Sequence, residues 1–164
     1  MSALNPYEGF LDGRPIQTIL ATTRGSLAKV LSVIGPDKLD TAPAPGKWSP
    51  AQIVCHLADC EIAFGFRLRQ TLAEDAPTLQ PFDQEKWAAT YGGVAAFRAL
   101  EAFTGLRGWN LRLIIDALPA AASRPAIHPE RGTMTFQTIV ETMAGHDLNH
   151  LGQLKKIAGI APAA

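Results

Sequence analysis

Two histidines stand four residues apart in the segment HDLNH, at positions 146 and 150. On a helix, residues at this spacing share one side, with Cβ atoms about 5–6 Å apart, so both imidazoles could bind one metal ion. Apolar residues continue the same line in steps of three and four. They are Ile139, Met143, Leu154 and Ile157. His146 and His150 are therefore predicted to point toward the core.

His56, in the earlier segment CHLADCE, is a third candidate ligand. It follows Ile53 by three residues and borders the apolar side of its helix, so it should face or flank the interior. Three inward histidines from two facing helices would leave open coordination positions, as catalytic metal sites do. Such a set suits a divalent ion, with Zn or Ni as the first candidates and Fe or Mn as further ones. An open position would hold a water or a low-molecular-weight thiol, whose pKa the ion lowers.

Two other interpretations of these histidines stay open. A single histidine on a helix is usually a hydrogen-bonded core or boundary residue, and the H-x₃-H spacing is frequent by chance. Burying several imidazoles without a partner is costly, which favours a metal. The rival from another class is a non-catalytic bundle or dimerisation module that a metal only stabilises. In the remaining interpretation no metal binds.

Two residues that follow His56 could also contribute to the site. Cys60, four residues later, could reach the same place, although a small buried cysteine is the commoner role. Glu61 is rotated off the His56 side of the helix. We expect it to be solvated or to support a ligand from behind.

Three polar residues around HDLNH have two interpretations each. Asp147 could orient a histidine ring as a hydrogen-bond acceptor, or it could lie on the surface. The same alternatives apply to Asn149 and Gln153. His128, in the segment IHPERG, is predicted to be an exposed loop residue, with a place in the lining of the site as the alternative.

Other catalytic motifs are missing from the sequence. There is no H-E-x-x-H, no Glu-x-x-His, no P-loop, no G-x-G-x-x-G and no G-x-S-x-G. The spacing of Cys55 and Cys60 is not C-x-x-C. No side chain is therefore predicted as a catalytic acid, base or nucleophile.

The composition is that of a globular chain. It has 164 residues, 47% of them hydrophobic, and equal numbers of basic and acidic residues, 15 of each. A single domain over residues 1–164 is expected. The charge balance gives no reason to expect nucleic acid or an anionic membrane as a partner. We expect no signal peptide and no membrane span, and we expect the two cysteines to stay reduced, so we predict a cytoplasmic protein.

Helical periodicity marks four segments, which predict an all-α, four-helix bundle. They are residues 14–34, 49–72, 94–118 and 135–158. The second has the best-marked start, because Ser49 and Gln52 form a capping box around Pro50. A connection of about twenty residues joins the second and third segments, which disfavours a simple up-down-up-down topology without excluding it. The segment RPAIHPERGT is predicted to be a loop, and no strands are expected.

The sequence resembles the DinB-like (DinB/YfiT) superfamily. The resemblance covers roughly residues 14–158 and rests on GKWSPAQIVCHLADCE and HDLNHLGQLKKI, with FDQEKWA in between. It implies a four-helix bundle that holds a divalent metal through His56, His146 and His150. The commonest form of the first motif has Glu where Gln52 stands here. That position caps a helix, so the difference leaves the proposed ligands unaffected.

The superfamily includes bacillithiol S-transferases, is related to mycothiol-dependent isomerases, and commonly forms homodimers. The resemblance therefore implies a metal-dependent hydrolase or thiol S-transferase that acts on a small electrophilic molecule. We expect a small-molecule substrate and a homodimer, with no nucleic acid and no membrane as partners. The connection around residues 77–93 is our candidate for shaping the mouth of the site.

Overall fold

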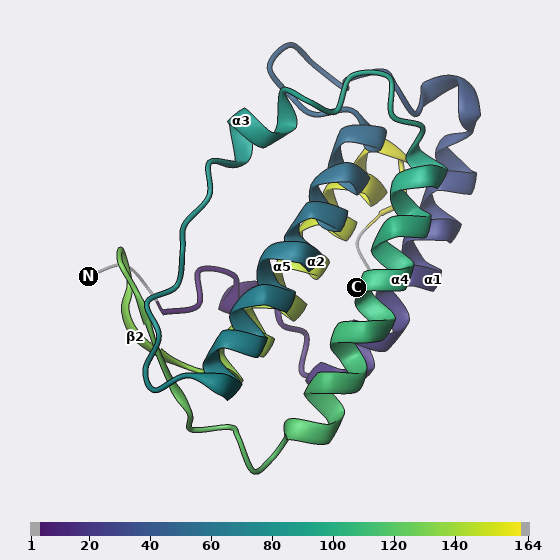
Figure 1. Ribbon diagram of the computed structural model, residues 1–164. Coiled ribbons are helices and arrows are strands. Elements are labelled where there is room, and N and C mark those ends of the chain that lie inside the picture. The colour runs from purple at the N-terminus through teal and green to yellow at the C-terminus, as the bar shows by residue number, and fades with distance from the viewer. Residues whose placement is uncertain (1–3, 162–164) are drawn as a thin grey trace.

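Four long helices build the protein, and the computed structural model describes residues 4–161. They are α1 (Ile16–Ile34), α2 (Pro50–Ala73), α4 (Ala96–Ala117) and α5 (Phe136–Ile157), shown in Figure 1. Each end lies within two residues of the predicted segment. The predicted four-helix bundle is confirmed.

The bundle does not follow an up-down-up-down path. In Figure 1, α1 and α5 run in one direction and α2 and α4 in the other. Both α4 and α5 pack against α2, and the same two helices pack against α1. The neighbours α2 and α4 are therefore parallel, and the chain must return along the whole bundle between them. This requirement explains the long connection, residues 74–95.

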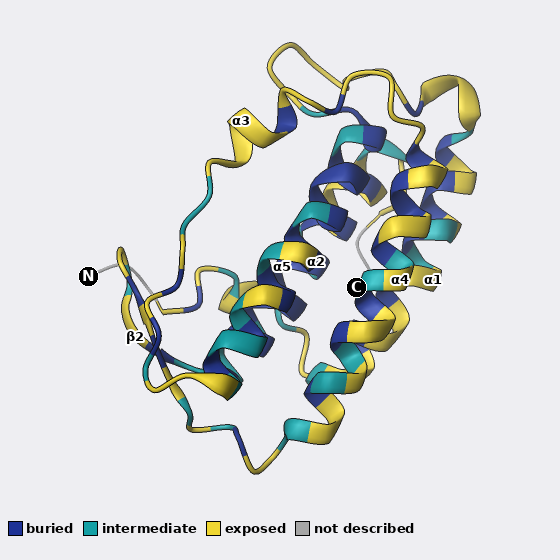
Figure 2. Ribbon diagram, in the orientation of Figure 1, coloured by how far each residue is buried: buried dark blue, intermediate teal, exposed yellow. Residues whose placement is uncertain are grey.

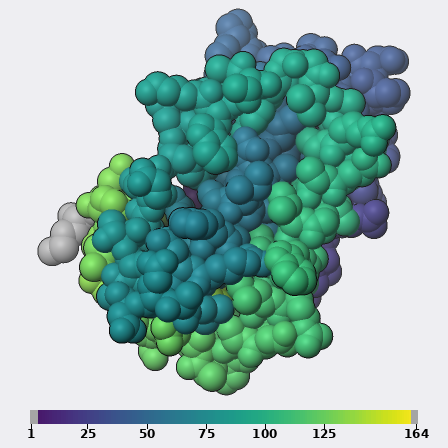
Figure 3. Space-filling model, in the orientation of Figure 1, coloured from purple at the N-terminus to yellow at the C-terminus, as the bar shows by residue number. Residues whose placement is uncertain are grey.

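Five short elements lie before or between the long helices. They are η1 (Glu8–Phe10), η2 (Pro36–Lys38), α3 (Gln84–Ala88), β1 (Pro125–His128) and β2 (Gly132–Thr135). The helix α3 lies in the long connection, which Tyr91 ties to α2 by donating a hydrogen bond to Asp59 at 2.6 Å. Figure 3 shows a narrow opening between this connection and α2.

The segment predicted to be a loop without strands is instead a β-hairpin. Its strands β1 and β2 pair antiparallel, with His128 opposite Gly132. Gly132 has a φ of +88°, which a glycine adopts without strain and which suits a three-residue hairpin loop. The alternation of burial along β1 is short, so the strand signal is weak in the sequence.

Side-chain caps fix the starts of α2 and α5. Ser49 accepts a hydrogen bond from the Gln52 backbone N–H, and the Gln52 side chain accepts one from the Ser49 N–H, so the predicted capping box is confirmed. At α5, Thr135 accepts from the backbone N–H of Thr138 at 3.1 Å. These two helices carry the three candidate ligands, so their starts set where the ligands lie.

Buried residues line the inward face of each long helix (Figure 2). They form two apolar clusters, one near each end of the bundle. Along α5, Met143 belongs to one cluster and Leu151 to the other, with His146 and His150 between them. The polar site therefore lies at mid-length, enclosed by apolar packing. Within residues 4–161, no helix combines the length and apolar character needed to cross a membrane.

Replacing Ser49 by alanine removes one half of the capping box. We expect the free energy of unfolding to fall by about 1 kcal/mol, because a backbone N–H at the start of α2 loses its acceptor. Urea denaturation measures this change. The control is Ser32→Ala, which removes an exposed hydroxyl within α1 and should stay within about 0.5 kcal/mol of the parent. Equal effects of the two substitutions would contradict a specific role for the cap.

Candidate metal centre

Three histidine nitrogens converge inside the bundle. His56 Nε2 lies 3.0 Å from His146 Nε2, which lies 3.1 Å from His150 Nε2. All three potential ligand atoms lie within 4.8 Å of one another. Nitrogens bound to one zinc ion at about 2.0–2.1 Å are about 2.8–3.4 Å apart, the shorter values in octahedral and the longer in tetrahedral geometry. The structure thus brings together the three residues that the sequence grouped, at a spacing that one ion could bridge.

Helix geometry and one hydrogen bond orient these rings. His146 and His150 project from successive turns of α5, and His56 projects toward them from α2. Gln153 Oε1 lies 3.0 Å from His150 Nδ1, so this nitrogen donates to the amide oxygen. The lone pair of His150 Nε2 is then directed at the other two rings, as metal ligation requires. Gln153 therefore supports a candidate ligand, which was one of its two predicted roles.

Aromatic rings enclose the cluster. Trp48 packs against His56 with ring centroids 4.8 Å apart and stacks on His150 at 6.4 Å. On the other side, Tyr7 contacts His146 edge-on at 5.1 Å, and Phe64 lies 6.1 Å from the same ring. The three imidazoles are only 1–6% exposed.

Burial keeps these histidines neutral. It lowers the pKa of His56 to about 3, and the proximity of His150 adds to this effect. It also lowers the pKa of His146 well below the ordinary value, and that of His150 to a smaller degree. Neutral imidazole is the form that binds a metal, so the three side chains fit a divalent ion in charge state as well as in spacing.

Cys60 lies against the cluster without joining the convergent set. Its Sγ is 3.5 Å from His56 Nε2 and 3.8 Å from His146 Nε2. Burial raises the pKa of its thiol, so the sulfur stays protonated. The convergent set contains three nitrogens, fewer than the four ligands of a closed zinc site.

Among residues 4–161, the remaining predicted neighbours form no side-chain hydrogen bond to the three histidines. Glu61, predicted to be solvated or to support a ligand, is buried and pairs with Arg107 at 2.6 Å. Asp147 is also buried, and both of its carboxylate oxygens accept hydrogen bonds from Arg107. Asn149 is half-buried. Within residues 4–161, the hydrogen bond to His150 comes from Gln153 and not from Asn149.

Arg107 holds the helices around the site together. From α4 it reaches Glu61 on α2, Asp147 on α5 and the backbone oxygen of Leu20 on α1. Asn110 adds a hydrogen bond to the second Glu61 oxygen at 3.0 Å. Burial raises the pKa of Glu61, and the Arg107 charge opposes that effect. The sequence did contain a signal for Arg107. It follows the apolar Phe103 by four residues, so it lies on the buried side of its helix, and Asn110 follows three residues later on the same side.

His128 was predicted to be exposed, and this was wrong. It is only 5% exposed, because β1 packs its side chain inward against the bundle. It lies outside the convergent set and lines a separate pocket with Phe64 and Arg131.

A cavity of about 900 Å³ adjoins the histidine cluster. His150, Gln153 and Trp48 line the side toward the cluster. Lys47 and Glu85 are among the charged residues at its rim, and Glu85 comes from the long connection that the sequence suggested as part of the mouth. The volume lies in the range of small-molecule sites, roughly 300–1,000 Å³.

Comparison with known proteins identifies the family and supports the fold. The family model of the DinB superfamily matches residues 19–154. A Bacillus cereus protein named "Putative metal-dependent hydrolase" is 34% identical over 132 residues, which cover 80% of this chain and 76% of that protein. Another of that name, from Oceanobacillus iheyensis, is 27% identical over 122 residues, or 74% and 71% of the two chains.

A solved structure shows the same architecture. YfiT from Bacillus subtilis, described as a probable metal-dependent hydrolase with an unusual four-helix bundle topology, superposes with a TM-score of 0.78. The match covers 89% of this chain and 87% of YfiT at 22% identity, which supports the fold. Fold and histidine cluster together define a bundle with a candidate metal centre. This chain belongs to the DinB superfamily.

Replacing Arg107 by alanine leaves two carboxylates buried without their cation. We expect the free energy of unfolding to fall by about 3–5 kcal/mol in urea denaturation. The matched control is Arg112→Ala on the same helix, which breaks an exposed pair with Asp116 and should cost about 0–1 kcal/mol. If Arg107→Ala does not fold, Arg107→Lys keeps the charge and should give a smaller, measurable loss. A stability equal to the parent in the lysine variant would contradict a structural role for the paired guanidinium contacts.

The lowered pKa of the buried histidines gives the metal-free protein an acid-sensitive stability. The folded-state pKa of His56 is about 3, below the ordinary 6.5, so the unfolded chain binds more protons between these pH values. The free energy of unfolding should therefore fall as the pH falls from about 6.5 toward 3. Urea denaturation of chelator-treated protein at several pH values tests this, and His56→Gln should flatten the dependence. A stability that rises on acidification over this interval would contradict it.

Proposed function

We propose that this chain is a metal-dependent enzyme in which His56, His146 and His150 hold one divalent ion. The observation that carries the proposal is the convergence of three neutral Nε2 atoms beside a cavity of substrate size. An all-imidazole set suits Zn²⁺ or Ni²⁺. The proposed reaction is hydrolysis of a small electrophilic molecule or transfer of a low-molecular-weight thiol to it, because both begin with an activated nucleophile.

The ion and the side chains around it would have different roles in the reaction. A bound ion supplies a Lewis acid that lowers the pKa of a water or thiol. Gln153 fixes the orientation of the His150 ring, and Trp48 shields the rings from bulk water. Burial keeps the Cys60 thiol protonated, so the attacking nucleophile would be a water or a thiol from solution. The cavity beside His150 is the proposed entry for the substrate.

A non-catalytic metal site is the second candidate, because Cys60 lies so close to two of the ligand nitrogens. If its sulfur lost a proton to the ion, the site would have four protein ligands and no open position. The metal would then stabilise the bundle without acting on a substrate. Cobalt substitution separates the candidates, since an added thiol perturbs the absorption spectrum only when a coordination position is open.

Removing one candidate ligand should remove the metal. We expect protein purified without a tag or chelator to contain about one divalent ion per chain by elemental analysis, and His150→Ala or His56→Ala to lose most of it. His128→Ala is the matched control, because it removes a buried histidine outside the cluster and should retain the ion.

The same variants test the enzymatic part of the proposal. In a screen of thiol adducts and hydrolysable esters, His150→Ala should abolish any turnover that the parent shows. Full activity in a metal-free preparation would overturn the metal-dependent mechanism. Cobalt bands that no added thiol perturbs would favour the non-catalytic site.

A further inference from the structure

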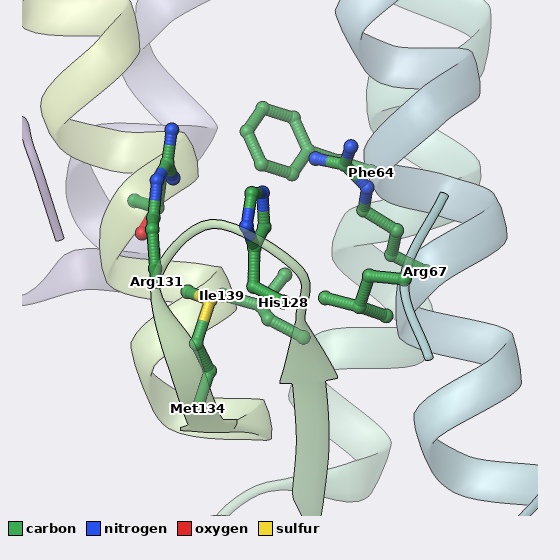
Figure 4. Close-up of a pocket in the computed structure, with 8 residues that line it drawn as sticks. Phe64, Arg67, His128, Arg131, Met134 and Ile139 are labelled. Atoms are coloured by element: carbon green, nitrogen blue, oxygen red, sulfur yellow. The ribbon is translucent and has the colours of Figure 1, made fainter. Parts of the chain in front are cut away.

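Three basic side chains surround a second, smaller pocket between the hairpin and α2. In Figure 4, His128 stands between Arg131 and Arg67, with the Phe64 ring opposite its tip. Arg67 comes from α2, and Arg131 comes from the turn of the hairpin. Both arginines are half-buried, whereas His128 is only 5% exposed. The pocket lies toward the start of α5, away from the cavity beside His150.

The hairpin turn makes His128 a hydrogen-bond donor to this pocket. The backbone N–H of Glu130 donates to His128 Nδ1 at 3.2 Å, so in the neutral ring Nε2 carries the proton. Burial lowers the pKa of His128, and the charges of Arg131 and Arg67 lower it further, so the neutral form prevails. A donor nitrogen that is buried among cations is suited to an anionic acceptor.

Neither arginine has an acidic partner among residues 4–161. Arg67 donates to the backbone oxygen of Gln80 at 2.8 Å and lies 5.9 Å from the ring of Phe64. Arg131 forms no ion pair with any carboxylate among residues 4–161. Burial lowers the pKa of Arg67, and the neighbouring Arg131 adds to this effect. Two half-buried guanidinium groups that line one pocket without a carboxylate would gain free energy from a bound anion.

The size and walls of the pocket select the kind of anion. Its free volume is about 10 Å³, roughly the room of one water, so it admits the oxygens of a terminal group and not a whole substrate. A carboxylate is the smaller of the common oxyanion groups, and its two oxygens match the planar guanidinium donors. Leu79, Met134 and Ile139 give the remaining wall an apolar lining, so the basic side chains offer the hydrogen-bond donors to the anion.

We propose that Arg67, Arg131 and His128 bind the terminal carboxylate of a small organic acid. The two guanidinium groups and the Nε2–H of His128 supply the hydrogen bonds, and the rest of the acid extends outside the pocket. Phe64 also packs against His146, so one aromatic ring separates the carboxylate site from the histidine cluster. The site uses no metal ligand and is independent of the proposed function.

Calorimetric titration with butyrate tests the proposal. The parent protein should bind butyrate saturably at one site, and Arg131→Gln or Arg67→Gln should weaken binding about tenfold or more, because a charged hydrogen-bond partner is lost. Arg112→Gln is the matched control, since Arg112 lies on the exposed face of α4, and it should bind as the parent does. Binding should also shift the imidazole NMR signals of His128.

Further titrations distinguish a carboxylate bound in this pocket from a ligand bound elsewhere on the protein. If Arg131→Gln fails to fold, Arg131→Lys keeps the charge and should show an intermediate loss. Binding should persist in chelator-treated protein; its loss together with the metal would place the ligand at the histidine cluster and overturn the proposal. Phosphate binding as tightly as butyrate would overturn the assignment to a carboxylate. Absence of saturable binding, or equal binding by all variants, would overturn the site itself.

Discussion

The buried guanidinium of Arg107 is the constraint on which the candidate metal centre depends. It joins α4 to α5 through Asp147 and to α2 through Glu61, and these two helices carry the three histidines. Buried ion pairs contribute little net stability compared with apolar packing, because removing charges from water is costly. Their geometry, however, is restrictive. We interpret the pairing as a device that fixes the separation of α2 and α5, on which the spacing of the ligand nitrogens depends.

A second constraint comes from burying three imidazoles in one place. Their nitrogens cannot all satisfy one another, because each pair can share only one proton. In the protein this cost is offset by apolar packing above and below the cluster and by Trp48, Tyr7 and Phe64 around it. A bound ion would satisfy all three Nε2 atoms at once. The site is thus a costly arrangement in an otherwise regular bundle, as functional sites often are.

Much of this architecture could be predicted from the sequence, because periodicity and capping are local. The helices and the inward direction of His146 and His150 follow from residue spacing alone. The partners of Glu61 and Asp147 could not be predicted in this way, since they depend on Arg107, which lies on another helix. The hairpin was missed because its strands are short. His128 was consequently placed in an exposed loop, although the pleat of β1 turns it inward.

X-ray absorption spectroscopy of the zinc-loaded protein tests the central claim most directly, namely that three histidines bind one ion and leave a position open. We predict three imidazole nitrogens at about 2.0–2.1 Å with one or more further light ligands from solvent. We predict no sulfur at about 2.3 Å, because Cys60 lies outside the convergent set. A zinc–sulfur distance, or fewer than three imidazoles, would contradict the claim.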